Sequence, residues 1–97
     1  MLKIGVGDVL ILLIYEVFDN QQSTEDNIRY KWEEKMFGPF NLENPEEEGA
    51  FRETIEALKA NIQIINEEWQ KNYQIDAFKN VQIKKVTITS LEIEDIQ

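Results

Sequence analysis

Carboxylates are the only titratable side chains that gather in dense groups along this sequence. The groups are Glu33-Glu34, Glu46-Glu47-Glu48, Glu67-Glu68 and Glu92-Glu94-Asp95. Paired carboxylates act as acid and base in glycoside hydrolysis, and they also bind divalent metal ions. Adjacent glutamates on a helix more often form a solvated face, and nothing around these groups in the sequence marks them for catalysis. We therefore predict no catalytic residue and no metal site among them.

Other residue types that carry enzyme chemistry are missing or badly spaced. The chain has no histidine and no cysteine, which excludes His-based triads, thiol nucleophiles, disulfides and Cys/His zinc sites. The segment from Asp19 to Tyr30 can be aligned with a calcium-binding loop, but Thr24 replaces its glycine and Tyr30 its bidentate glutamate. Gly5 and Gly7 lack the third glycine of a dinucleotide-binding motif. We expect no enzymatic activity and no cofactor.

Aromatic side chains and one acidic group are the candidate partner-binding residues. Tryptophan and tyrosine are enriched among the residues that dominate protein interfaces. Two phenylalanines flank a Gly-Pro pair, whose stiff backbone would present an apolar anchor at low entropic cost. Packing in a small core is the alternative role for these aromatics. The candidates are Trp69, Tyr73, Phe37, Phe40, Glu46, Glu47 and Glu48.

Net charge restricts the partners that this chain can have. Its 97 residues include 19 acidic and 10 basic side chains, for a formal charge of −9. A negative surface repels phosphate backbones and anionic membranes, so we expect no direct nucleic-acid binding and no membrane association. The excess charge serves solubility or attracts a basic protein. The apolar run Val9–Tyr15 is shorter than the roughly 18 residues of a membrane-spanning helix, so we interpret it as core and expect a cytoplasmic protein.

Hydrophobic patterns in the first 44 residues predict a hairpin. Residues 9–18 are almost continuously apolar, which fits either a strand buried on both faces or a buried helix. Their β-branched residues favour the strand. Residues 28–33 alternate between apolar and charged, so a strand over residues 27–33 should pair with this strand across the polar segment 19–26. We expect the segment 36–40 to break the pattern, because Pro39 cannot donate to a sheet ladder.

A long amphipathic helix is the clearest prediction from the sequence. Asn44 is the expected N-cap, Pro45 suits the first turn, and the glutamates that follow suit the positive end of the helix dipole. Apolar residues then recur at spacings of three and four and form one stripe, which consists of Phe51, Ile55, Leu58, Ile62, Ile65 and Trp69. The helix should run over residues 45–71 and be about 40 Å long. A three-stranded sheet is narrower than this, so the helix ends should project or meet a second copy.

The C-terminal stretch completes the predicted architecture. Residues 81–94 have a strand-like composition, but their alternation shifts between Ile83 and Val86 and again between Ile88 and Leu91. A bulged strand, or two short strands, would explain these shifts. We predict a single α+β domain over residues 1–97, with a small antiparallel sheet in β-β-α-β order and the helix on one face.

These features favour a binding role over catalysis. We expect a non-enzymatic protein–protein interaction or assembly subunit that self-associates into a homo-oligomer, with Trp69 and Tyr73 near the contact. The alternative is an acidic inhibitor, of the immunity or nucleic-acid-mimic type, that blocks a basic protein partner. The position of the carboxylates should separate the two, because a contiguous acidic patch supports inhibition and an even scatter supports assembly.

Overall fold

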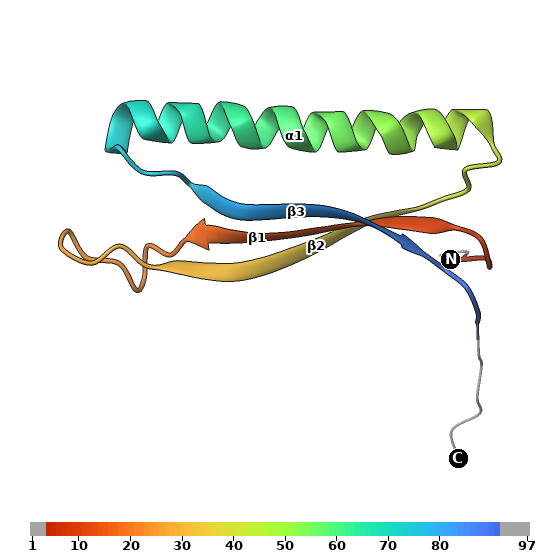
Figure 1. The fold of residues 1–97 in the computed structure, drawn as a ribbon, viewed down its shortest axis with the longest axis horizontal. Coiled ribbons are helices and arrows are strands. Elements are labelled where there is room, and N and C mark those ends of the chain that lie inside the picture. The colour runs from red at the N-terminus through yellow and green to blue at the C-terminus, as the bar shows by residue number, and fades with distance from the viewer. Residues whose placement is uncertain (1–3, 92–97) are drawn as a thin grey trace, which may run out of the picture.

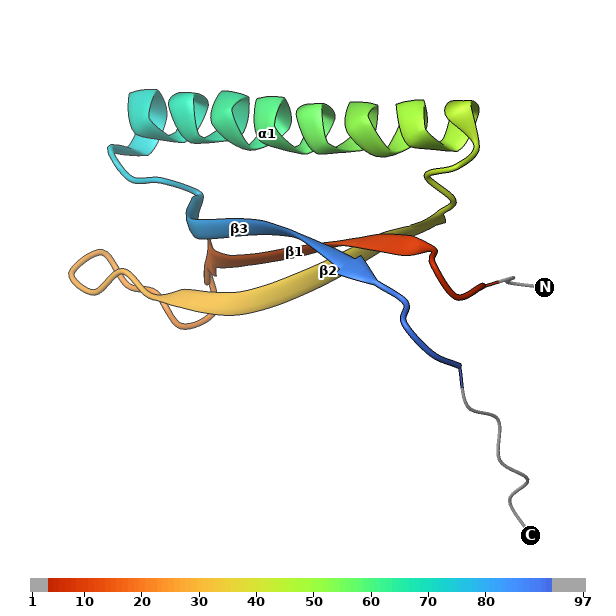
Figure 2. The ribbon, with the colours of Figure 1, turned by 45° about the vertical axis from the view of Figure 1, so that its right-hand side comes forward.

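The computed structural model describes residues 4–91. Along the chain, two strands are followed by one long helix and then by a third strand. The elements are β1 (Val9–Phe18), β2 (Tyr30–Phe40), α1 (Pro45–Tyr73) and β3 (Phe78–Thr87) (Figure 1). The strands form one antiparallel sheet in the order β2-β1-β3, so β1 is central. Figure 2 shows α1 on one side of this sheet. The predicted α+β class and β-β-α-β order are confirmed, and residues 9–18 form a strand and not a helix.

The core lies between the central strand and the helix. Side chains of β1 alternate between the two faces of the sheet, and the members that face α1 are buried: Val9, Ile11, Leu13 and Tyr15. The ring of Phe78, at the start of β3, packs edge-on against Tyr15 at a centroid distance of 5.4 Å. Every second residue of β1 therefore contributes to one thin apolar layer.

β2 continues through the Gly-Pro pair, so the expected break at residues 36–40 is wrong. Pairing with β1 shifts by one residue between Val9 and Ile11, which places a bulge in β2 at Gly38 and the cis proline after it. Gly38 has a φ of 117°, and a Cβ there would lie 3.1 Å from the carbonyl oxygen of Val9. Proline is tolerated because β2 is an edge strand. The extra residue turns Phe37 and Phe40 toward the same face.

β3 is a bulged strand, but its bulge is not where the sequence pattern placed it. The register shifts between the partners of Ile14 and Glu16, where Asn80 has a φ of 51°. Pairing from Ile83 to Val86 is continuous, so the slip predicted there is wrong. Because Ile83 and Val86 are three residues apart in this unbroken pairing, they lie on opposite faces of the sheet, each beside apolar residues of β1. Residues 88–91 follow the strand, and residues 92–94 of the predicted strand lie outside the described residues.

Both ends of α1 carry capping interactions. The side-chain oxygen of Asn44 accepts a hydrogen bond of 3.0 Å from the backbone N–H of Glu46, which confirms the predicted N-cap. Gln74 follows the helix in the left-handed conformation, with a φ of 60°. The helix has 29 residues, is about 44 Å long and ends at Tyr73 rather than Lys71.

The helix runs along the strands and not across them (Figures 1 and 2). A strand of 10 residues is about 33 Å long, so strand length covers most of the helix, contrary to the expectation based on sheet width. The apolar stripe is nevertheless incompletely covered, because no residue of α1 is fully buried. A cavity of 160 Å³ remains between Phe37 of β2 and Leu58 and Ile62 of α1. The radius of gyration, 17.6 Å, exceeds the roughly 13 Å of a compact domain of this length.

Candidate functional site

Trp69 and Tyr73 lie side by side at the C-terminal end of α1. Their ring centroids are 5.0 Å apart, and the indole ring of Trp69 also packs 5.3 Å from the ring of Phe18, at the end of β1. Together with Ile28 and Ile75, these side chains line an open cleft of 660 Å³, which we call the aromatic cleft. Trp69 is half-buried, whereas 60% of Tyr73 is exposed. The structure thus brings together two of the predicted partner-binding residues.

The loop between β1 and β2 forms one wall of the aromatic cleft. Its first residue, Asp19, accepts a hydrogen bond of 3.0 Å from the backbone N–H of Gln21. The hydroxyl of Ser23 accepts from the backbone N–H of Arg29 at 2.9 Å and donates to the carbonyl of the same residue at 3.1 Å. The polar side chains of the loop therefore hold its own backbone, and this holds Ile28 at the cleft.

Phe37 and Phe40 lie in the layer between the sheet and the helix. The ring of Phe40 packs 5.6 Å from the ring of Phe51, in the N-terminal part of α1. Phe37 lines the cavity beneath the middle of the helix. Both side chains are half-buried, and both make contacts within the chain. A partner-anchoring role for them stays a prediction.

The acidic group Glu46-Glu47-Glu48 occupies the first turn of α1, at the end of the helix opposite the aromatic cleft. Glu48 forms an ion pair of 2.8 Å with Arg52, one helical turn further on. The carboxylate of Glu47 accepts a hydrogen bond of 3.3 Å from the backbone N–H of Asn41. These contacts, and the favourable position at the positive end of the helix dipole, account for the group within the chain. The structure does not bring these residues near Trp69 and Tyr73.

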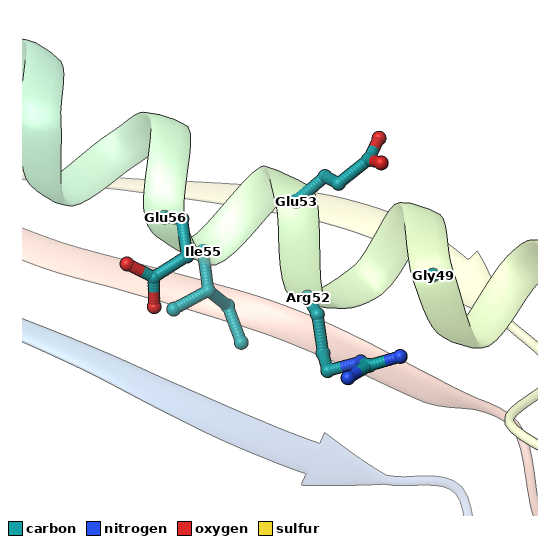
Figure 3. Close-up of a pocket in the computed structure, with 5 residues that line it drawn as sticks. All are labelled: Gly49, Arg52, Glu53, Ile55 and Glu56. Atoms are coloured by element: carbon teal, nitrogen blue, oxygen red, sulfur yellow. The ribbon is translucent and has the colours of Figure 1, made fainter.

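A second hollow, of 660 Å³, lies beside the N-terminal half of α1 (Figure 3). Among its lining residues, Ile55 points toward the sheet and Glu53 away from it (Figure 3). β3 turns away from α1 toward its C-terminal end, which leaves this side of the helix uncovered (Figure 1). No polar side chain in the described range 4–91 is buried. Neither hollow therefore contains a buried polar group of the kind that orients a small-molecule ligand.

The face of the sheet opposite α1 is a further candidate surface, which we call the open sheet face. It consists of the alternate residues of β1 that point away from the helix, together with their cross-strand partners. Its apolar members are Leu10, Leu12, Ile14, Trp32, Met36 and Val86. Trp32 and Met36 are each 57% exposed. No helix or strand of residues 4–91 lies over this face (Figures 1 and 2).

Charged side chains on the open sheet face balance one another, although the whole chain is strongly acidic. The register places Glu16, Glu34, Lys79 and Lys84 on this face. The ammonium of Lys79 lies 4.2 Å from the centroid of the Tyr30 ring, and the side-chain amide of Asn80 donates a hydrogen bond to Glu16. The face is therefore apolar at its centre and close to neutral overall.

Sequence reasoning did not identify the open sheet face, although two signals pointed to it. Residues 9–15 are apolar at both odd and even positions, as expected for a strand that is covered on both sides. The alternation also shifts between Ile83 and Val86, and the structure shows that these side chains serve the two faces separately. Tryptophan is a residue type enriched at interfaces, but the face on which Trp32 lies could not be assigned without the position of α1.

Within residues 4–91, no three His, Cys, Asp or Glu residues lie close enough together to hold a metal ion. No helix in this range is long and apolar enough to cross a membrane. Comparison of the chain with protein-family models, curated proteins and solved structures finds no match. The geometry of the surfaces is therefore the basis for a functional proposal.

Proposed function

We propose that this protein is a non-enzymatic assembly subunit whose open sheet face is covered by another protein. The observation that carries the proposal is the two-sided apolar character of β1. One side of this central strand is buried against α1, while Leu10, Leu12 and Ile14 on the other side are only half-buried, with no helix or strand of residues 4–91 over them (Figures 1 and 2). Sheets that are apolar on both faces normally have a packed layer on each face. The missing layer is thus supplied by a partner.

The composition of the open sheet face supports this role. Its two most exposed members, Trp32 and Met36, are of residue types enriched in protein interfaces. Isolated exposed apolar residues are ordinary, but soluble monomers keep contiguous apolar patches small. Here the exposed residues adjoin Leu12 and Ile14 of β1, with charged residues among and around them. An apolar centre with a polar rim is the usual anatomy of an interface.

The distribution of charge favours assembly over the inhibitor alternative. Carboxylates are spread along α1 from Glu46 to Glu68, and Arg52, Lys59 and Lys71 are interspersed among them. In β3 the charged side chains are all lysines, at positions 79, 84 and 85. This scatter does not provide the single acidic surface that would block a basic partner. The proposal includes a cytoplasmic location and no cofactor. It also includes no direct contact with nucleic acid, because the net charge is negative.

Two matched variants test the proposed function. Trp32→Glu places a charge on the open sheet face, and Ile64→Glu makes the same change on α1, where Ile64 is 58% exposed. We expect wild type to self-associate, or to retain a protein from an extract of its native cells, in a way that Trp32→Glu abolishes and Ile64→Glu preserves. The proposal is contradicted if all three chains are monomeric and retain the same proteins.

A further inference from the structure

We infer that the partner on the open sheet face is a second copy of this chain, bound face to face with a twofold axis parallel to β1. This inference rests on the proposed assembly function and adds the occupant and its orientation. The resulting dimer has four layers, helix-sheet-sheet-helix, and each β1 is covered on both sides. Sheets in such sandwiches pack about 10 Å apart with their strands nearly aligned.

The area of the open sheet face matches a small but specific dimer. Three strands about 4.8 Å apart and about 33 Å long present roughly 500 Å² per copy. Two copies together would bury about 1,000 Å², which is the lower limit for a specific interface. We therefore expect a dimer that dissociates at roughly micromolar concentration, not an obligate one.

The charges of the open sheet face are self-complementary in one orientation. β2 contributes the acidic Glu34, and β3 contributes the basic Lys79 and Lys84. A twofold axis parallel to the strands places β2 of one copy over β3 of the other. Glu34, level with Ile14, then lies diagonally opposite Lys84, which is level with Leu12, and this pair occurs twice. An axis perpendicular to the strands would place β2 on β2 and β3 on β3, which brings like charges together.

The same balance of charge favours an identical copy over a strongly charged partner. A basic protein would be attracted to a surface with excess carboxylates, whereas this face has as many lysines as glutamates. Its central residues, Leu12 and Ile14, lie on β1 and therefore near the axis, where each would meet apolar residues of the second copy. Self-association thus covers the apolar centre and pairs the charges at the same time.

Light scattering over a range of concentrations tests whether the partner on the open sheet face is a second copy of this chain. Wild type should change from monomer to dimer around micromolar concentration, and Trp32→Glu should weaken the dimer at least about tenfold, because it replaces a large apolar side chain of this face with a carboxylate directly opposite Glu16 of β1. Ile64→Glu should leave the dimer unchanged. Circular dichroism of each variant checks that the fold is retained.

A charge exchange tests the orientation and does not depend on the folding of Trp32→Glu. Glu34 and Lys84 are both exposed, so their substitution should leave the monomer folded. Glu34→Lys and Lys84→Glu should each weaken the dimer severalfold, and the double variant should recover most of the loss. Failure of the double variant to recover would overturn the β2-over-β3 orientation.

Three further results would overturn the inference in distinguishable ways. A monomeric wild type that still retains a different protein through Trp32 would refute the second copy and leave the proposed function standing. A dimer that Trp69→Glu dissociates and Trp32→Glu does not would place the contact at the aromatic cleft. A monomeric wild type that retains no protein through Trp32 would refute both the inference and the proposed function.

Discussion

Replacing Asn66 with alanine should loosen the attachment of α1 to the sheet. The Asn66 side chain donates a hydrogen bond of 2.9 Å to the backbone carbonyl of Phe78 and accepts one of 2.8 Å from the backbone N–H of the same residue. Both bonds are partly buried, and they join the third quarter of the helix to the first residue of β3. Asn66→Ala removes both and leaves the Phe78 backbone groups without these partners.

The size of the effect follows from these two bonds. Each neutral hydrogen bond contributes about 1 kcal/mol to the free energy of unfolding, and more when its partner is left unsatisfied away from water. Alanine has a higher helix propensity than asparagine, which returns about 0.5 kcal/mol. The net loss should be about 2 kcal/mol. This is a large effect for a helix that has no fully buried residue of its own.

Urea denaturation followed by circular dichroism measures this loss, with every variant at one protein concentration so that any dimerisation contributes equally. Gln63→Ala is the matched control, because its amide donates to Glu67 at 3.0 Å on the exposed face of the same helix. That variant should change the free energy of unfolding by less than about 0.5 kcal/mol. An equally small change for Asn66→Ala would refute the conclusion that these two hydrogen bonds hold the helix to the sheet.

Three further predictions concern the backbone, the helix stripe and the first loop. Gly38→Ala should lower the free energy of unfolding by about 1–3 kcal/mol, because φ at this position is 117°. Gly49→Ala, where nothing lies within 4 Å of the added Cβ, should raise it by about 0.5–1 kcal/mol. Similar denaturation midpoints for the two variants would contradict this prediction. Leu58→Ala and Ile62→Ala should each lower the free energy of unfolding, measured by denaturation, by about 1–2 kcal/mol. This is the lower part of the range for core truncations, because both side chains are only half-buried. Losses below about 0.5 kcal/mol for both variants would show that the apolar stripe of the helix is not packed. Calorimetry should detect no micromolar calcium site at the loop that begins with Asp19, whose carboxylate is engaged by backbone N–H groups, and tight binding there would overturn this reading.

The helix was predictable because its signals are local. Asn44 and the proline after it determine the start of α1 through contacts within one turn, and the spacing of the apolar stripe selects the face toward the sheet. None of this depends on neighbouring strands. What the sequence did not reveal was the direction of the helix, because packing along the strands or across them uses the same stripe.

The wrong predictions for β2 and β3 have a common cause, because both depend on which strands pair with each other. The proline in β2 was expected to end the strand, but it lies on an edge where no neighbour requires its N–H. Gly38 allows the bulge that turns Phe37 and Phe40 toward α1. The bulge of β3, at Asn80, likewise depends on its pairing with β1. Strand neighbours and register are set by contacts distant in sequence, so composition alone could not locate either bulge.

The candidate surfaces were predictable to different degrees. Trp69 and Tyr73 are four residues apart on a helix, so their proximity follows from helical geometry. The contact of Trp69 with Phe18 required knowing that the end of β1 lies beneath the end of α1. The open sheet face required more, since Trp32 and Met36 could equally have faced the helix until the register with β1 was known.

In β3, the shift in the apolar alternation between Ile83 and Val86, which predicted a bulge, has a different origin. A strand whose sheet has one solvated face keeps its apolar residues on the other, and a one-residue shift then signals a bulge. Ile83 and Val86 break that rule without a bulge between them, because Ile83 pairs with Leu13 on the covered face and Val86 with Leu10 on the open one. Both partners belong to the run of β1 that is apolar on each side. The pattern is that of a sheet with a layer on either side; α1 is one of those layers, and the proposed second copy would be the other.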